Sequence, residues 1–220
     1  PAFRGRVVMD FVDVDSAKFE AYAQTGALPR RLLYAREARL MRRFEEQTAR
    51  RVTTSLFITA QERALFESRL EQGALPDVRA LGNGIDTELF DPAAVSPAPE
   101  LAGDGPSFVF TGQMDYAPNI AAANRTIERL LPAIRAVHPA ATCHVVGRNP
   151  PAELLAHHGK DGAHVWGGVD DIRCWLAAAD LALVPLEIAR GVQNKVLEAM
   201  AMARPVVAAA PCVEAIDALS

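Results

Sequence analysis

The chain has 220 residues, of which 50% are hydrophobic and 23% are charged, and its formal net charge at pH 7 is −4. This composition predicts a globular protein with a substantial core, built as one large or two modest domains. The acidic balance argues against nucleic acid as a partner, and no apolar run reaches the roughly 18–20 residues that span a membrane. Three scattered cysteines without metal-ligand spacing indicate reduced thiols in a cytoplasmic protein.

Strand and helix patterns alternate in the first part of the chain. Three segments are expected as strands: residues 6–13, 52–59 and 78–81. A helix is expected over about residues 29–50, and Thr59 with Glu62 forms a capping box that starts the next helix. These strands are too few for a complete doubly wound domain, so we expect its opening strands to lie outside this chain.

Residues 91–106 are rich in Pro, Ala and Gly without periodicity, and we interpret them as a linker. Five strands are expected after it: residues 107–114, 141–147, 164–169, 181–186 and 205–210. A helix is expected through residues 120–134, and further helices near residues 151–158, 171–179, 192–203 and 212–219. Strands that are apolar on both faces and alternate with helices predict a doubly wound parallel α/β sheet.

Two loops of the second part follow strands and lead into helices, where open parallel sheets bind ligands. In the first loop, Gly112 would let the backbone approach a phosphate beside the N–H groups of the next helix. The second loop turns at Gly191 into a helix that carries Lys195 and Glu198 on one face. A lysine in the first turn of a helix is disfavoured by the helix dipole unless an anion lies there. Glu198 could accept hydrogen bonds from both hydroxyl groups of a ribose. The alternative is that the first loop is an ordinary strand–helix turn and that Lys195 and Glu198 form an ordinary ion pair on an amphipathic helix.

Several motifs follow one another in a specific order. They are residues 44–63 (a Glu-bearing helix and the turn after it), LGNGIDTELF at 81–90, FVFTG at 108–112, VVG at 145–147, DDIRCWLAAADLALVP at 170–185 and KVLEAMAMARPVVAA at 195–209. This order resembles glycosyltransferase family 4, and the resemblance covers about residues 7–210. With DFVDVDS at 10–16 and the loop before Lys195, the chain looks nearest to the branch associated with exopolysaccharide assembly.

The resemblance implies an α/β fold of GT-B type with two Rossmann-like, doubly wound domains, both incomplete in this chain. Residues 1–90 would be the end of the acceptor-side domain, 91–106 the linker and 107–220 the donor domain. It implies transfer, with retention of configuration, from a nucleotide-diphosphate sugar to a polysaccharide or lipid-linked glycan. No metal or other cofactor is expected. A GT-B nucleotide-sugar 2-epimerase and a non-catalytic nucleotide-sugar-binding module stay open as alternatives.

The resemblance also assigns residues. Glu198 matches the family's ribose-contacting glutamate, whereas Arg190 stands where its sugar-contacting glutamate would lie, and the family's two cations after the first donor strand are absent. We therefore expect Arg190 and Lys195 to meet the diphosphate, and assign Arg190, Lys195 and Glu198 to catalysis. Further substrate contacts are expected from Gly112, Gln113, Asn119, Arg148, Gly191, Val192, Gln193 and Asn194. Asp13 and Asp15, at a strand end of the first part, would face the acceptor, with a solvated loop as the alternative.

Residues 30–51 contain eight arginines and three glutamates. A basic amphipathic helix of this kind can lie on an anionic membrane surface, which would suit a lipid-linked acceptor at the inner face of the membrane. A solvated helix face with a few ion pairs explains the same pattern.

Overall fold

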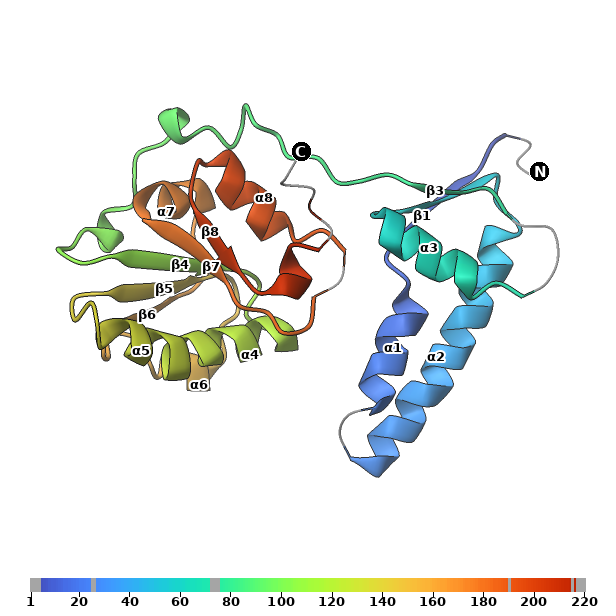
Figure 1. Cartoon of the computed structure of the whole chain (residues 1–220), viewed down its shortest axis with the longest axis horizontal. Coiled ribbons are helices and arrows are strands. Elements are labelled where there is room, and N and C mark those ends of the chain that lie inside the picture. Colours follow the sequence, from blue (N-terminus) through green and yellow to red (C-terminus); the bar gives the residue numbers. More distant parts are fainter. Residues whose placement is uncertain (1–4, 25–26, 72–75, 190, 215, 217–220) are drawn as a thin grey trace. The chain divides into compact units, whose positions relative to one another are not determined.

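The computed structural model describes residues 5–24, 27–71, 76–189, 191–214 and 216. The chain forms two compact units, Pro1–Asn83 and Gly84–Ser220, and each is described by itself (Figure 1). Within the described ranges, every helix is too short or too polar to cross a membrane.

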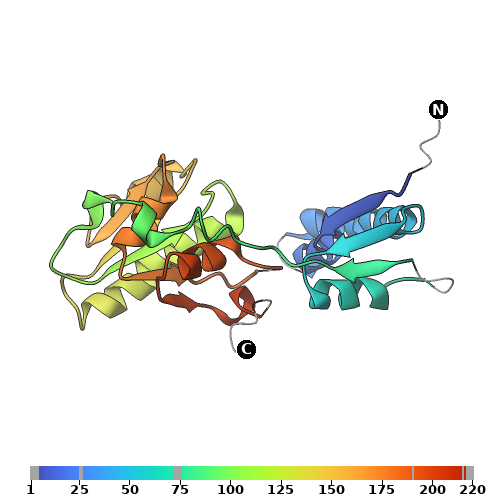
Figure 2. The ribbon, with the colours of Figure 1, turned by 90° about the horizontal axis from the view of Figure 1, so that it is seen from above.

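The first unit is built on a parallel sheet of three strands in the order β1-β2-β3, which lie side by side in Figure 2. These strands are Val8–Val12, Thr54–Phe57 and Val78–Ala80, and the helices are α1 (Asp15–Gln24), α2 (Leu28–Ala49) and α3 (Ala60–Ser68). A core around Val14, Phe57, Phe66 and Val78 joins the sheet to the helices. The predicted start of α3 is present, because Thr59 Oγ1 accepts a hydrogen bond from the Glu62 N–H at 2.9 Å.

Helix α1 is an addition to the predicted elements. Its sequence has little segregation of apolar residues, so periodicity gave no signal for it. A distant residue stabilises its first turn, since the Ser16 N–H donates at 2.8 Å to Oε1 of Glu45, near the C-terminal end of α2. A carboxylate at a helix N-terminus satisfies free N–H groups and complements the dipole. The helix therefore depends on a tertiary contact that local sequence does not display.

The second unit is built on a parallel sheet of five strands in the order β6-β5-β4-β7-β8. The strands are β4 (Ser107–Thr111), β5 (Thr142–Val146), β6 (Ala163–Trp166), β7 (Leu181–Val184) and β8 (Val206–Ala208). Helices α4 (Ala117–Arg125), α5 (Leu131–Arg135) and α6 (Ala152–Leu155) cover one face, and α7 (Ile172–Ala178) and α8 (Asn194–Ala201) the other (Figure 1). Separate apolar clusters on the two faces include Phe110 with Leu131, and Trp175 with Met202. All strands here are shorter than predicted because their last residues enter the loops.

Three predicted segments differ in detail. The single helix expected through residues 120–134 contains a π-helical segment, Thr126–Leu130, before α5. Pro132 has no N–H to donate, and the Leu131 N–H reaches Thr126 O, five residues back. At the C-terminal end, Cys212 closes a 3-10 helix (Ala210–Cys212) and Val213 and Glu214 form a turn, in place of the expected helix. The rest of that segment, apart from Ile216, lies outside the described residues.

Residues 91–106, interpreted as a linker, are counted in the second unit. They contain two short 3-10 helices, Pro92–Ala94 and Pro99–Leu101. Ala98 and Leu101 are buried against the α7 side of the sheet, and the Ala98 N–H donates to Cys174 O at 2.9 Å. The boundary between the compact units lies instead at Asn83 and Gly84. The sparse apolar residues of this stretch pack without any regular period, so no pattern predicts their burial.

Candidate functional site

The sheet of the second unit has one point where the chain reverses its direction of strand addition. From β4 the chain adds β5 and β6 on one side, and then returns to add β7 and β8 on the other. Ligands of open α/β sheets bind at such a point, beyond the carboxyl ends of the strands. Here those ends lead into Gly112 after β4 and into the loop of residues 185–193 after β7.

Lys195, in the first turn of α8, meets the loop after β4 at this point. Its Nζ donates to Asn119 Oδ1 at 2.8 Å and lies 4.8 Å from the centre of the Phe110 ring. Asn119, which is buried in α4, in turn donates from Nδ2 to Gln113 O at 2.9 Å. The structure therefore brings together three of the predicted site residues, Lys195, Asn119 and Gln113, from two loops that are far apart in sequence.

The space around Gly112 explains why a glycine stands there. A Cβ atom at this position would lie 2.9 Å from Asn119 Nδ2 and 3.0 Å from Lys195 Nζ. On the neighbouring strand end, a Cβ at Gly147 would lie 1.5 Å from Gly112 O. The two glycines let β4 and β5 end in close contact. Because residue 112 is a glycine, no side chain at that position crowds the Lys195 amine.

Burial perturbs both ionisable groups of α8. It lowers the pKa of Lys195 to about 8, an effect that the nearby Cys212 and Glu198 oppose. It raises the pKa of Glu198, and the charge of Lys195 acts in the opposite direction. Among the described residues, Lys195 forms no ion pair with a carboxylate. A half-buried ammonium group held by a neutral amide is an unbalanced positive charge, and an anion would compensate it.

The other predicted residues of this unit lie around the same edge. Gly191 has a positive φ of 61°, which a glycine adopts without strain. Gln193 is the N-cap residue of α8, Asn194 is the first residue of that helix, and Val192 is half-buried just before them. Arg190, one of the three residues assigned to catalysis, lies outside the described residues.

Arg148 follows Gly147 at the end of β5 and is exposed. Its carbonyl accepts the Met114 N–H at 2.8 Å, which ties the loop after β5 to the loop after β4. Its side chain runs along Gly168, where a Cβ would lie 2.9 Å from Arg148 Cγ. The aliphatic part of Arg148 is thus directed along the β6 side of the edge, away from the β7 side where Lys195 begins its helix.

Asp13 and Asp15 belong to the first unit, at the carboxyl end of β1. Asp13 lies in the loop after the strand, which leaves the sheet at Val12 with φ of 67°, and Asp15 is the first residue of α1. Two buried glutamates hold this loop from either side. Glu62 Oε2 accepts the Val14 N–H at 2.8 Å, and Glu45 accepts both the N–H and the hydroxyl of Ser16.

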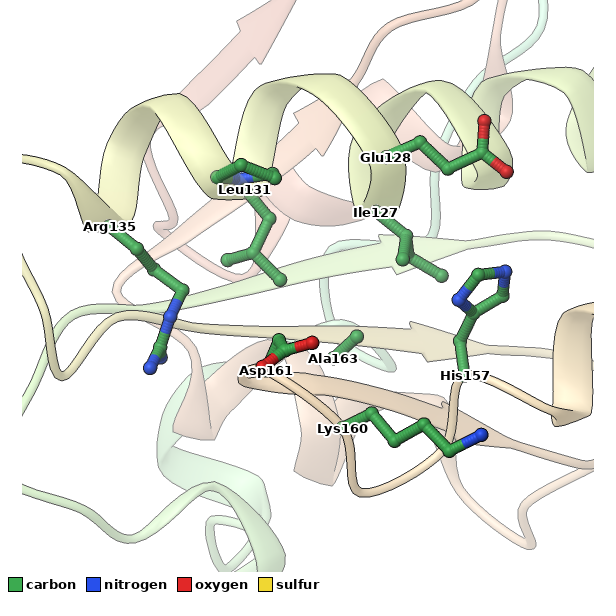
Figure 3. A pocket seen from close by; sticks show the side chains of 9 residues that line it. Ile127, Glu128, Leu131, Arg135, His157, Lys160, Asp161 and Ala163 are labelled. Carbon is green, nitrogen blue, oxygen red and sulfur yellow. The ribbon is translucent and has the colours of Figure 1, made fainter.

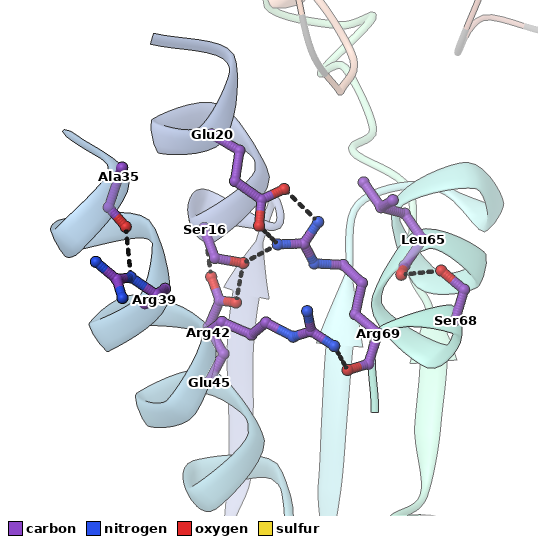
Figure 4. Close-up of polar contacts among 9 residues, drawn as sticks. All are labelled: Ser16, Glu20, Ala35, Arg39, Arg42, Glu45, Leu65, Ser68 and Arg69. Atoms are coloured by element: carbon purple, nitrogen blue, oxygen red, sulfur yellow. Dashed lines mark hydrogen bonds and ion pairs between the residues drawn. The ribbon is translucent and has the colours of Figure 1, made fainter. Parts of the chain in front are cut away.

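Figure 4 shows how this arrangement continues. Arg69 donates to both Glu20 oxygens, at 2.6 and 2.8 Å, and to Ser16 Oγ at 3.2 Å. Burial raises the pKa of Glu45, and the bonds from Ser16 oppose that effect. The sequence missed these positioning residues, although a signal existed: Glu45 and Glu62 both lie in the stretch 44–63 that resembles the family.

One surface pocket, of about 430 Å³, lies on the second unit at the amino end of β6 (Figure 3). Ile127, Leu131 and Ala163 form its floor, and Arg135, His157 and Lys160 are among its rim. None of the predicted site residues lines it. Within the described ranges, no three His, Cys, Asp or Glu side chains gather as a metal ion would require.

Comparisons with known proteins agree with this geometry. The family model for group 1 glycosyl transferases matches residues 105–218, which is more than half of the chain. No curated protein sequence matches it. Among solved structures, HepE of Anabaena in complex with UDP and glucose is 17% identical, with a TM-score of 0.65 over 96% of this chain and 55% of that one.

Two enzymes with other names have the same fold. Sucrose-phosphate synthase of Thermosynechococcus elongatus is 18% identical, with a TM-score of 0.65 over 94% of this chain and 51% of that one. Trehalose-6-phosphate synthase of Burkholderia multivorans is 13% identical, with a TM-score of 0.62 over 86% and 51%. The chain thus spans about half the length of these structures. The predicted fold class, a parallel-sheet α/β fold of GT-B type, is confirmed.

Proposed function

Because this chain belongs to the group 1 glycosyltransferases, we propose that it moves a sugar from a nucleotide-diphosphate sugar to a polysaccharide or lipid-linked glycan, with retention of configuration. Within the group we place it in family 4, near the exopolysaccharide branch. The observation that carries the proposal is the Lys195 amine, half-buried at the reversal point of the sheet and bonded to Asn119 at 2.8 Å. The HepE structures, with UDP or UDP-glucose bound, suggest a uridine nucleotide for the first tests.

The proposed chemistry requires stabilisation of the negative charge that develops on the departing diphosphate. Fixed cations and helix N–H groups can supply that stabilisation without a metal ion. Lys195 is one such cation, and we expect N–H groups at the start of α8 to contribute as well. We assign Arg190 as the second cation. Glu198, one turn further along α8, would accept hydrogen bonds from the two ribose hydroxyl groups.

The acceptor side is assigned to the loop after β1. Asp13 and Asp15 lie there, and Glu45 and Glu62 fix the backbone on which they stand. A loop that is fixed in advance can orient the reacting hydroxyl of the acceptor, because Asp13 and Asp15 are already in position when the acceptor binds. The contact of residues 30–51 with a membrane surface belongs to the same proposal, since a lipid-linked acceptor would be presented there.

The test is a calorimetric titration with UDP, GDP and ADP, compared with UMP and 2′-deoxy-UDP. We expect one nucleoside diphosphate to bind at least about tenfold more tightly than its monophosphate, because the unbalanced Lys195 charge meets the second phosphate. Glu198→Gln should lower the affinity for UDP about tenfold and that for 2′-deoxy-UDP by less, because only the 3′-hydroxyl then remains to bond with residue 198. Glu153→Gln, an exposed glutamate on α6, is the matched control.

Three outcomes would contradict the proposal. If no nucleoside diphosphate binds or stabilises the chain, the donor site is absent. If UDP-GlcNAc is converted to its 2-epimer without an acceptor, the chain is an epimerase. If a nucleotide sugar binds but is never consumed with any glycan acceptor, the chain is a binding module.

A further inference from the structure

The pocket of about 430 Å³ at the amino end of β6 lies between the turn that leads into this strand and α5 with the π-helical segment before it. Ile127, Leu131 and Arg135 follow one another at four-residue spacing, which places them along one row of the helix surface. In Figure 3 the Ile127 and Leu131 side chains point toward the turn that carries Asp161. Arg135 and His157 lie at the two ends of the pocket in that view. Its volume is within the range of about 300–1,000 Å³ that small-ligand pockets occupy.

The turn on the other side of the pocket is fixed by its own backbone and by Arg135. The Ala163 N–H donates to Lys160 O at 2.8 Å, and the two residues between them, Asp161 and Gly162, have positive φ angles of 47° and 80°. An Asp-Gly pair adopts this tight turn readily. Arg135 Nη1 is the atom nearest to the place that a Cβ of Gly162 would occupy, so the guanidinium group packs against the turn. Both sides of the pocket are therefore set before a ligand binds, which lowers the entropy cost of binding.

The charged groups that line the pocket are of both signs and do not pair with one another. Glu128 and Asp161 supply two carboxylates, Arg135 and Lys160 supply two cations, and the formal charges cancel. In the part of the chain that the structure describes, none of the four takes part in an ion pair. A carboxylate only accepts hydrogen bonds, whereas an ammonium or guanidinium group only donates them. A hydroxyl group does both, so a ligand with several hydroxyl groups can bond to all four side chains.

We propose that this pocket binds one or two sugar units of a neutral glycan, at a place separate from the donor site. A sugar ring has C–H groups that can pack on the floor of Ile127, Leu131 and Ala163, and hydroxyl groups at its edge that can bond to the charged rim. A nucleotide is disfavoured because its phosphates would meet two carboxylates. The pocket lies at the amino end of β6, whereas Gly112 and the donor loop follow the carboxyl ends of their strands in the same parallel sheet.

The inference rests on the proposed function for its purpose. A glycan that is bound at two places on one protein dissociates more slowly than a glycan bound at one. A second sugar site would therefore keep a growing polysaccharide on the enzyme between transfers, without occupying the place where the nucleotide sugar binds.

The test is two-dimensional NMR of the 220-residue chain with labelled methyl groups, titrated with cellobiose, maltose and N,N′-diacetylchitobiose. We expect at least one of these sugars to shift the methyl signals of Ile127 and Leu131, with a dissociation constant of about 1 mM, as suits an open pocket with an exposed rim. Glu128→Gln/Asp161→Asn should weaken that binding about tenfold, because charge-assisted hydrogen bonds become neutral ones. Asparagine tolerates the positive φ of residue 161, so the turn is kept.

The matched control is Glu100→Gln/Asp104→Asn, which makes the same chemical changes on exposed residues of the segment before β4. This variant should bind the sugar as the wild type does. Saturating UDP should also leave the sugar affinity unchanged, because the two sites lie at opposite ends of the strands. The methyl spectrum of each variant without ligand shows whether it is folded.

Four results would overturn the sugar site. They are methyl signals that no saccharide shifts, displacement of the sugar by UDP, equal affinity of the pocket variant and the wild type, and a response to alanine but to no sugar. The last result would make the pocket a site for a zwitterion. A separate UDP titration reports on the donor site, so failure of this inference is recognised independently of failure of the proposed function.

Discussion

Replacing Lys195 by methionine should make the protein more stable and its nucleotide binding weaker. The folded-state pKa of Lys195, about 8, lies below the ordinary lysine value of 10.5. The folded state therefore resists protonation, and the charged lysine costs stability at every pH below about 8. The difference of about 2.5 pH units corresponds to a limit of about 3 kcal/mol. Because Lys195 is only half-buried, solvent screening reduces our expected gain for Lys195→Met to about 1–2 kcal/mol at pH 7.

The pH dependence gives this prediction its sign. As the pH rises from 8 toward 10.5, Lys195 loses its proton in the folded state first, so its cost disappears. By pH 10 the advantage of Lys195→Met should shrink to about a quarter of its value at pH 7. Urea unfolding at the two pH values measures this difference. Lys160→Met, which removes an exposed lysine, is the matched control and should change stability little at either pH.

Binding provides the second half of the test. A diphosphate beside Lys195 would restore its proton, so UDP binding at pH 8 should take up about half a proton. Calorimetry in buffers with different ionisation enthalpies measures that uptake, and Lys195→Met should abolish it and weaken UDP about tenfold or more. The reasoning is refuted if Lys195→Met is less stable than the wild type at pH 7. It is refuted equally if UDP binds the variant with unchanged affinity.

Two further predictions concern the sheet of the second unit. Gly147→Ala should lower the free energy of unfolding by about 3 kcal/mol or more, because its Cβ would lie 1.5 Å from the backbone oxygen of Gly112. Gly167→Ala is the control, since no atom lies within 4 Å of its Cβ, and urea unfolding should show almost no change. Equal effects of the two substitutions would contradict the packing argument. Burial, together with the nearby His164 and His158, lowers the pKa of His144 to about 4, so stability present above pH 6.5 should be lost as the pH falls toward 4, by at most about 3 kcal/mol. His144→Gln should remove that part of the acid sensitivity, and parallel curves of unfolding free energy against pH for the wild type and the variant would show that His144 does not contribute.

The pH sensitivity of His144 follows from its hydrogen bonds. Trp166 Nε1 donates to His144 Nδ1 at 3.2 Å, so that nitrogen acts as an acceptor and the neutral ring carries its hydrogen on Nε2. Nε2 faces Thr142 Oγ1 at 3.2 Å. Protonation of Nδ1 would break the bond to Trp166 inside a stack of aromatic rings. The cost of charging the ring is therefore both the loss of solvation and the loss of an acceptor.

The sequence predicted those features that depend on local pattern. In the part of the chain that the structure describes, apolar runs predicted each strand to within a few residues, and the capping box located the start of α3. Helix α1 was missed because its first turn depends on Glu45, 29 residues further along the chain. The π-helical segment was missed because the expected helix follows the spacing of apolar residues, which does not register that Pro132 lacks an N–H. In both cases a single residue outside the periodic pattern decides the local structure.

The candidate site was predictable as a set of loops but not as a set of contacts. Asn119 and Lys195 are separated by 76 positions, and their contact exists only because β4 lies between β5 and β7. No pattern in the sequence specifies that strand order. The sequence indicated Gly112 as a place where a phosphate can approach the backbone. The structure adds a steric reason for a glycine at this position, which the spacing of residues in the sequence does not contain. The atoms nearest to its missing Cβ belong to Asn119 and Lys195.

Asn119 also gives a physical reason why the loop after β4 lacks the two cations that the family has there. A lysine or arginine at this position would lie within about 3 Å of the Lys195 amine, and two cations at that distance repel each other in a half-buried site. The neutral amide of Asn119 accepts a hydrogen bond from Lys195 Nζ at Oδ1 and donates one from Nδ2 to Gln113 O. A single cation supplied from α8, and fixed by an amide from α4, can occupy this position without a second charge. The expectation that Lys195 meets the diphosphate therefore depends on Asn119 as well, because a neutral acceptor at residue 119 leaves the lysine charge available to an anion.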